Sequence, residues 1–115
     1  MKEFLMIFRN AHLPEGKYSP DEMQDIMQQW QNWMGSIAAQ NKLANSGSRL
    51  GSEGLTIKPG KVITNGPYTE IKEIVGGYII VTADSLEDAT EIGMECPILN
   101  VGGSVEVRTQ IPMNG

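Results

Sequence analysis

Two segments of the chain are apolar on both of their faces. Residues 3–9 (EFLMIFR) and 74–83 (IVGGYIIVTA) carry large apolar side chains at consecutive positions. A strand with one wet face alternates between apolar and polar residues, so an unbroken apolar run indicates a strand that is covered on both sides. We therefore predict two central strands. Gly76 and Gly77 indicate a bulge or a close backbone approach near the start of the second.

A long amphipathic helix is predicted between these strands. Ser19 can cap a helix that begins at Pro20, and Glu22 can return a hydrogen bond to the cap. Apolar residues then recur at intervals of three and four up to about residue 42. This stripe consists of Met23, Ile26, Met27, Trp30, Met34, Ile37 and Ala38.

The two tryptophans of this helix receive different assignments. Trp30 belongs to the apolar stripe and is assigned to the core. Trp33 lies on a neighbouring part of the helix surface and is assigned to the edge of a cleft or to a subunit contact.

The remaining segments are shorter. Residues 43–50 are rich in Gly, Ser and Asn and predict a short or irregular strand, while residues 55–58 and 61–64 flank a Pro-Gly turn and predict a hairpin. Residues 104–108 alternate between apolar and polar positions, as a final strand with one wet face would.

A second, shorter helix precedes that last strand. Ser85 can cap it, and Pro97 cannot continue it. One face of this helix is predicted to carry Leu86, Ala89, Ile92 and Cys96.

The predicted order is strand, helix, strand with an inserted hairpin, central strand, helix, strand. This is the ferredoxin-like α+β arrangement, an antiparallel sheet with two helices on one face. No repeat or linker divides the chain, so we expect a single domain over residues 1–115. Because both central strands are also apolar on the face away from the helices, we predict that a second copy covers that face in a homodimer.

Composition narrows the choice of partner and compartment. The chain has 115 residues and a net charge of -5. Nucleic acids and anionic membranes attract clustered Lys and Arg, so neither is predicted as the main partner. No apolar run approaches the ~20 residues of a membrane span, and the first residues lack a signal-peptide pattern, so a cytoplasmic protein is expected.

Neither the single histidine nor the single cysteine predicts a reactive site. His12 has no second histidine at metal-ligand spacing, so we predict an ordinary loop residue and no metal. Cys96 has no positively charged neighbour in sequence and is predicted to pack in the core. Because motifs for nucleotide cofactors are absent from the sequence, no cofactor is predicted.

Polar candidates for a site follow a turn at residues 65–67. Glu70 and Lys72 lead into the second central strand, where a loop can overhang a cleft held by a rigid sheet. In such a cleft Glu70 would be the acid or base, Lys72 would anchor an anionic substrate, and Tyr68 would be a further polar contact. The alternative is a solvated charged loop.

Arginines at strand ends are further candidates. Arg9 and Arg108 end the first and last predicted strands, and Arg49 ends the loose second strand. Such a side chain can bind a substrate carboxylate through two hydrogen bonds, or it can pair with a protein acid such as Glu106. Arg49 and Arg108 are therefore candidates for substrate binding.

Four motifs together resemble the DGPF branch of the YCII-related family. They are NGPYTEIKE at residues 65–73, GGY at 76–78, ADSLEDA at 83–89 and VEVR at 105–108. The resemblance covers nearly the whole chain. It implies a dimeric ferredoxin-like α+β barrel, and it adds Asn65 in the turn to the candidate binding residues.

What the resemblance implies about function is less uniform. Some relatives look like small enzymes without a cofactor, including a dehydrochlorinase of aromatic catabolism with a His-Asp pair, and others are linked to extracytoplasmic sigma factors. This chain has Asn65 where the branch has aspartate and Trp30 where enzymatic relatives have histidine. An amide or an indole cannot replace a general base.

Two functions therefore stay open. One is a protein that binds a small organic molecule in a cleft beside residues 65–73, with or without catalysis. The other is a non-catalytic regulatory or protein-interaction module.

Overall fold

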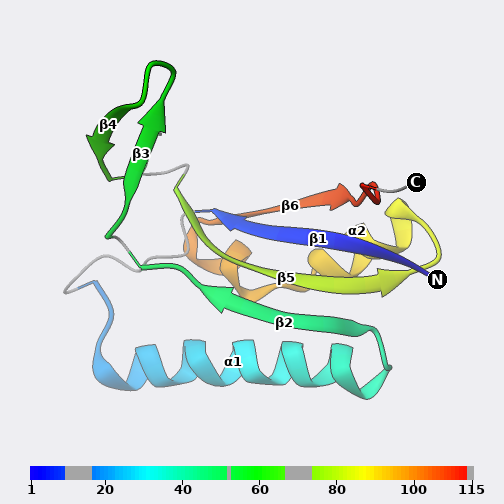
Figure 1. Ribbon diagram of the computed structural model, residues 1–115. Helices are drawn as coiled ribbons and strands as arrows, with labels where there is room; N and C mark the ends of the chain where they lie inside the picture. Colours follow the sequence, from blue (N-terminus) through cyan, green and yellow to red (C-terminus); the bar gives the residue numbers. More distant parts are fainter. Residues whose placement is uncertain (10–16, 52, 67–73, 114–115) are drawn as a thin grey trace.

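Four strands form one antiparallel sheet in the order β2-β5-β1-β6 (Figure 1). The computed structural model describes residues 1–9, 17–51, 53–66 and 74–113. The strands of this sheet are β1 (Lys2–Arg9), β2 (Leu43–Arg49), β5 (Val75–Ala83) and β6 (Ser104–Thr109). The two predicted central strands, β1 and β5, occupy the middle of the sheet.

Helices α1 (Pro20–Ala39) and α2 (Leu86–Gly93) contribute to one core with the same face of this sheet. Alternate side chains of the central strands point toward the helices and are buried. The core contains Phe4, Met6, Phe8, Ile79, Val81 and Ala83 from the sheet, Trp33, Ile37 and Ala89 from the helices, and Cys96 and Ile98. The order of elements and strands is the predicted ferredoxin-like α+β arrangement.

Both helices begin as their caps predicted. The Ser19 hydroxyl accepts a hydrogen bond from the Glu22 N–H at 3.1 Å, and the Glu22 carboxylate accepts one from the Ser19 N–H at 3.0 Å. In α2 the Ser85 hydroxyl accepts one from the Asp88 N–H at 3.1 Å. Helix α1 ends a little earlier than predicted, because Asn41 adopts a φ of 60° that a right-handed helix cannot continue.

The buried side of α1 differs from the prediction. Trp33 is 7% exposed and donates its indole N–H to the Ile92 carbonyl oxygen at 3.1 Å, whereas Trp30 is half-buried. Met27 and Ala38, predicted on the buried stripe, are exposed. Trp30 packs against the core as predicted but is only partly buried, whereas Trp33, assigned to a cleft edge or a subunit contact, is a buried member of the core. The reason is that α2 covers the Trp33 side of the helix.

The segment after α2 contains a short 3-10 helix, η2 (Pro97–Val101), that the pattern did not predict. Leu86, expected on the buried face of α2, is 41% exposed because it is the first residue of the helix. Cys96 is 2% exposed, and burial raises the pKa of its thiol to about 12. The predicted packing role of Cys96 is thus confirmed, since a thiol with so high a pKa carries little thiolate at neutral pH.

Glycines allow β2 and β5 to approach each other closely. Gly47 has a φ of +63°, and a Cβ at this position would overlap the Tyr78 carbonyl oxygen. A Cβ on Gly77 would lie 2.9 Å from the Ser48 carbonyl oxygen. The register of β1 with β5 skips Gly76, so the predicted bulge and the predicted close approach are both confirmed.

The predicted hairpin is also present, as a separate two-stranded sheet that stands apart from the main one (Figure 1). Its strands are β3 (Leu55–Lys58) and β4 (Val62–Asn65). Leu55, Ile57 and Ile63 share one of its faces and are 66%, 71% and 62% exposed.

The face of the main sheet away from the helices has an apolar centre and a charged edge. Its centre is formed by the half-buried side chains of Leu5, Ile7, Tyr78 and Ile80. At the edge, Glu106 accepts hydrogen bonds from Arg9 at 3.2 and 3.1 Å and from Arg108 at 2.9 Å. Pairing with Glu106, the alternative predicted for these two arginines, is confirmed. The hydrogen bond from Arg108, followed by those from Arg9, lowers the pKa of Glu106.

Gly47→Ala should destabilise the fold, because the added methyl group would overlap the Tyr78 carbonyl and alanine resists the positive φ. We expect the free energy of unfolding to fall by about 2 kcal/mol or more in urea denaturation. The matched control is Gly35→Ala in α1, where the new Cβ would point into open space. That substitution should stabilise the protein by about 0.5–1 kcal/mol. Equal effects of the two changes would contradict the close approach.

The contacts of Glu106 predict a pH-dependent contribution to stability. Because the pKa of this carboxyl is lower in the folded protein than the ordinary 4.5, the unfolded chain takes up the proton first as the pH falls. The stabilisation is present above the unfolded pKa and is lost as the pH falls through the folded pKa. Glu106→Gln should therefore flatten the decline of the unfolding free energy below about pH 5. Urea denaturation at a series of pH values measures this decline.

Arg108→Gln should flatten the same decline only in part, because Arg9 still contacts the carboxylate. An unchanged slope in Glu106→Gln would show that the arginine contacts do not contribute to acid stability.

Candidate functional site

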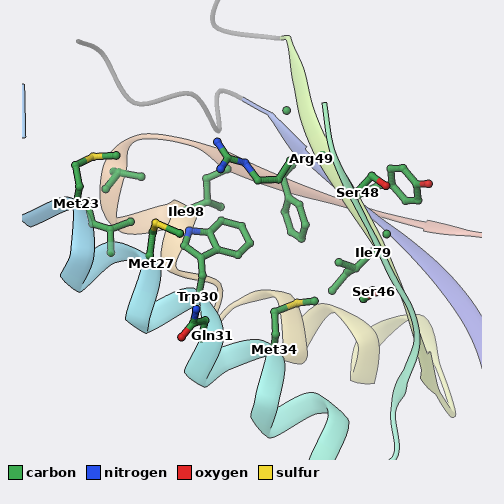
Figure 2. Close-up of a pocket in the computed structure, with 17 residues that line it drawn as sticks. Met23, Met27, Trp30, Gln31, Met34, Ser46, Ser48, Arg49, Ile79 and Ile98 are labelled. Carbon is green, nitrogen blue, oxygen red and sulfur yellow. The ribbon is translucent and has the colours of Figure 1, made fainter. Parts of the chain in front are cut away.

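A cavity of about 510 Å³ opens between α1, the end of β2 and η2 (Figure 2). Pockets that hold small organic molecules have volumes of roughly 300–1,000 Å³, so this cavity is in the range for such a ligand. Helix α1 contributes one wall, which consists of Met23, Ile26, Met27, Trp30, Gln31 and Met34. The 3-10 helix η2 contributes Ile98 and Val101, and the sheet contributes Phe8 and Ile79.

Missing side chains in the sheet help to keep this space open. Gly77 of β5 pairs with Phe8 on one side and with Arg49 on the other. The alternation along β5 places position 77 on the helix-facing side, where a larger side chain would project toward the cavity. The glycine that lets β2 approach β5 therefore also leaves room for a ligand.

Three aromatic rings meet at one side of the cavity. The Phe8 and Trp30 ring centroids are 5.1 Å apart, those of Phe8 and Trp33 are 6.0 Å apart, and those of the two tryptophans are 5.7 Å apart. All three pairs meet edge to face, the geometry that aromatic quadrupoles favour. Because Trp33 is also held by its hydrogen bond to Ile92, the two buried rings position Trp30 at the cavity wall.

Arg49 is the only charged side chain among the described residues that line the cavity. Figure 2 shows it extending from the end of β2 over the cavity toward α1. The residue is exposed, and within the described ranges it forms no ion pair. It therefore differs from Arg9 and Arg108, which both bind Glu106.

The chemistry of this lining is suited to binding. None of its described residues is His, Cys, Asp, Glu or Lys, the side chains that most often transfer protons in catalysis. Side chains with hydrogen-bonding groups in the lining include those of Gln31 and Ser46. A mostly apolar cavity with one cation and a few polar groups can hold an organic molecule and orient it.

The structure brings one predicted binding residue to this cavity and places two others elsewhere. Arg49 lines the cavity. Arg108 lies on the opposite face of the sheet with Glu106, and Asn65 ends β4 in the separate hairpin. These three residues therefore do not form one site within this chain.

The other predicted site residues lie outside the described part of the chain. They are Tyr68, Glu70 and Lys72, and His12 lies outside it as well. The cleft beside residues 65–73 and the roles of these side chains stay predictions.

The role of α1 as a cavity wall was not predicted from the sequence. Met23, Met27 and Trp30 were assigned to the core, because helical spacing identifies an apolar stripe but not the element that covers it. Gly77 was the one signal in the sequence that indicated a cavity at this place. A core position without a side chain in a central strand leaves a gap beneath the helix.

Other kinds of site find little support in the described residues. In that part of the chain no group of three or more His, Cys, Asp or Glu side chains could hold a metal ion. No described helix is long and apolar enough to cross a membrane.

Comparison with known proteins places the chain in a family. No functionally curated protein matches the sequence. One similar solved structure is 5-chloro-2-hydroxyhydroquinone dehydrochlorinase from Burkholderia phenoliruptrix AC1100 in complex with 2,5-dihydroxybenzoquinone. It is 15% identical, with a TM-score of 0.49 over 97% of this chain and 96% of that one. The sequence model of the YCII-related domain matches residues 4–114, and the chain therefore belongs to the YCII-related domain family.

Proposed function

We propose that this domain binds a small, largely apolar organic molecule in the cavity between α1 and β2, and that it does so as a homodimer. The observation that carries the proposal is the cavity of about 510 Å³ with apolar walls, whose described lining holds a single charged side chain. Burial of apolar surface would supply most of the binding free energy.

The walls combine a rigid part with an adaptable part. Trp30 is held by edge-to-face contacts with Phe8 and Trp33, so its ring need not be ordered when a ligand binds. Met23, Met27 and Met34 have flexible, polarisable side chains that can adjust to the outline of a ligand. Both properties support binding of a flat organic molecule.

Catalysis would depend on residues beyond the described lining, because that lining contains no carboxylate, imidazole, thiol or amine. In this proposal Glu70 keeps its predicted role as acid or base, and Tyr68 and Lys72 keep theirs as substrate contacts.

In this proposal a second copy covers the outer face of the main sheet, which is the face away from the helices. Leu5, Ile7, Tyr78 and Ile80 are only half-buried in one chain and form adjacent rows across β1 and β5. A second copy packed on this patch in a symmetric manner would remove it from water.

A non-catalytic interaction module is the alternative, and the hairpin favours it. Leu55, Ile57 and Ile63 form an exposed apolar face on an element that stands apart from the main sheet (Figure 1). Such a face can mark a contact with another protein. If the domain binds no small apolar molecule, this alternative explains its function better.

Met27→Gln should weaken binding in the cavity without changing its charge. We expect the neutral probe 2-naphthamide to bind the wild-type protein in isothermal titration calorimetry, and the variant to bind it roughly 3- to 10-fold more weakly through lost apolar contact. Met27 is 53% exposed, so the change should not disturb the core.

Met94→Gln is the matched control for this measurement, because Met94 is 65% exposed and lies at the end of α2. It should leave the affinity for 2-naphthamide unchanged. Absence of binding to the wild-type protein, or equal losses in the two variants, would count against the cavity as the site.

Ile80→Lys should convert the dimer to a monomer, because it places a charge in the apolar centre of the outer sheet face. The mass in solution, measured by light scattering after size-exclusion chromatography, should fall to that of one chain. Leu99→Lys on η2, where the native side chain is 46% exposed, should leave the mass unchanged. A wild-type protein that is already monomeric would refute the homodimer.

A further inference from the structure

We propose that the cavity selects an aromatic carboxylate, with Arg49 binding the carboxylate and the ring lying against Trp30. This inference rests on the proposed function, since it names the class of molecule that the cavity takes. It comes from the charge, the geometry and the chemistry of the walls.

The charge of the lining is opposite to that of the chain. The sequence has a net charge of -5, with 14 acidic residues against nine Lys and Arg. The described lining nevertheless contains no Asp or Glu and one arginine. An anion would therefore meet a cation in the cavity and no described carboxylate that repels it, whereas a cationic ligand would find no described counter-charge.

The three arginines of the chain differ in whether they bind a carboxylate of the protein. Arg9 and Arg108 share the carboxylate of Glu106 on the outer face of the sheet. Arg49 has no carboxylate partner within the described ranges, and its side chain extends over the cavity (Figure 2). A ligand carboxylate can supply the partner that Glu106 supplies to the other two, through two parallel hydrogen bonds.

The backbone beneath Arg49 is held in place. Position 49 pairs with Gly77, and a Cβ on Gly77 would come within 3.5 Å of the Arg49 Cα. Gly47, two residues earlier, donates its N–H to the Asn45 side chain at 2.7 Å, where the pairing of β2 with β5 shifts its register between Asn45 and Ser48. The origin of the arginine side chain is therefore fixed relative to Trp30, although the side chain itself is exposed.

The walls favour a flat aromatic body over a branched or polar one. The half-buried ring of Trp30 and the thioethers of Met23 and Met27 offer stacking and sulfur–aromatic contacts. One guanidinium is the only described cation in the lining, which matches a singly charged carboxylate better than a doubly charged phosphate ester.

The test compares three probes that share one ring system and differ in their head group: 2-naphthoate, 2-naphthamide and 2-naphthyl phosphate. In isothermal titration calorimetry the wild-type protein should bind 2-naphthoate about tenfold more tightly than 2-naphthamide, because only the carboxylate forms charge-assisted hydrogen bonds. Arg49→Gln should weaken the binding of 2-naphthoate about tenfold, so that the variant no longer prefers 2-naphthoate to 2-naphthamide. Arg49→Lys should retain part of the preference, since it keeps the charge but loses the paired geometry.

Arg108→Gln is the matched control, because it removes an arginine from the opposite face of the sheet. The preference for 2-naphthoate should persist in this variant. Equal binding of 2-naphthoate and 2-naphthamide by the wild-type protein would overturn the inference and leave the cavity as a site for neutral molecules.

Three further outcomes would also overturn the inference. A preference for the carboxylate that survives in Arg49→Gln would assign recognition to another group. Tighter, Arg49-dependent binding of 2-naphthyl phosphate would assign the cavity to phosphate esters. Failure of all three probes to bind would refute the proposed function together with the inference.

Discussion

The antiparallel pairing of β1 with β5 is the constraint on which the rest of this structure depends. These neighbouring strands carry apolar side chains on both faces, so each face needs a cover. On one face, Phe4, Met6 and Val81 are buried in the core shared with the two helices. On the other, Leu5 and Ile80 lie directly opposite each other and stay half-buried in the single chain, which is why the proposed function includes a second copy.

Glycine at a few positions changes what this sheet can do. Gly47 and Gly77 allow β2 to lie so close to β5 that a Cβ at either position would meet the backbone of the other strand. The same absence of a side chain at Gly77 leaves a gap under α1, between Phe8 and Arg49. Close packing between two strands and an open space above them thus have one cause. A larger residue at position 77 would oppose both.

The helix above the gap has one side in the core and another at the cavity. Trp33 binds the Ile92 carbonyl oxygen and is covered by the core, while Trp30 and Met27 face the cavity. The cavity therefore has a rigid wall at Trp30, whose ring is held by Phe8 and Trp33, and a flexible wall at the methionines. Arg49 adds the single charge of the described lining, so the cavity combines apolar contact with one directional anchor.

The sequence by itself determined the features that depend on neighbouring residues. Ser19 and Glu22 are three residues apart and cap α1 through local hydrogen bonds, and the apolar runs in β1 and β5 identify central strands without knowledge of their partners. Only the tertiary structure decided which tryptophan is buried and which arginine meets the cavity. Trp33 donates its indole N–H to Ile92, 59 residues away, and Arg9 pairs with an acid 97 residues away. Helical spacing and strand position leave such choices open, because they describe which side chains share a face and not which distant element covers it.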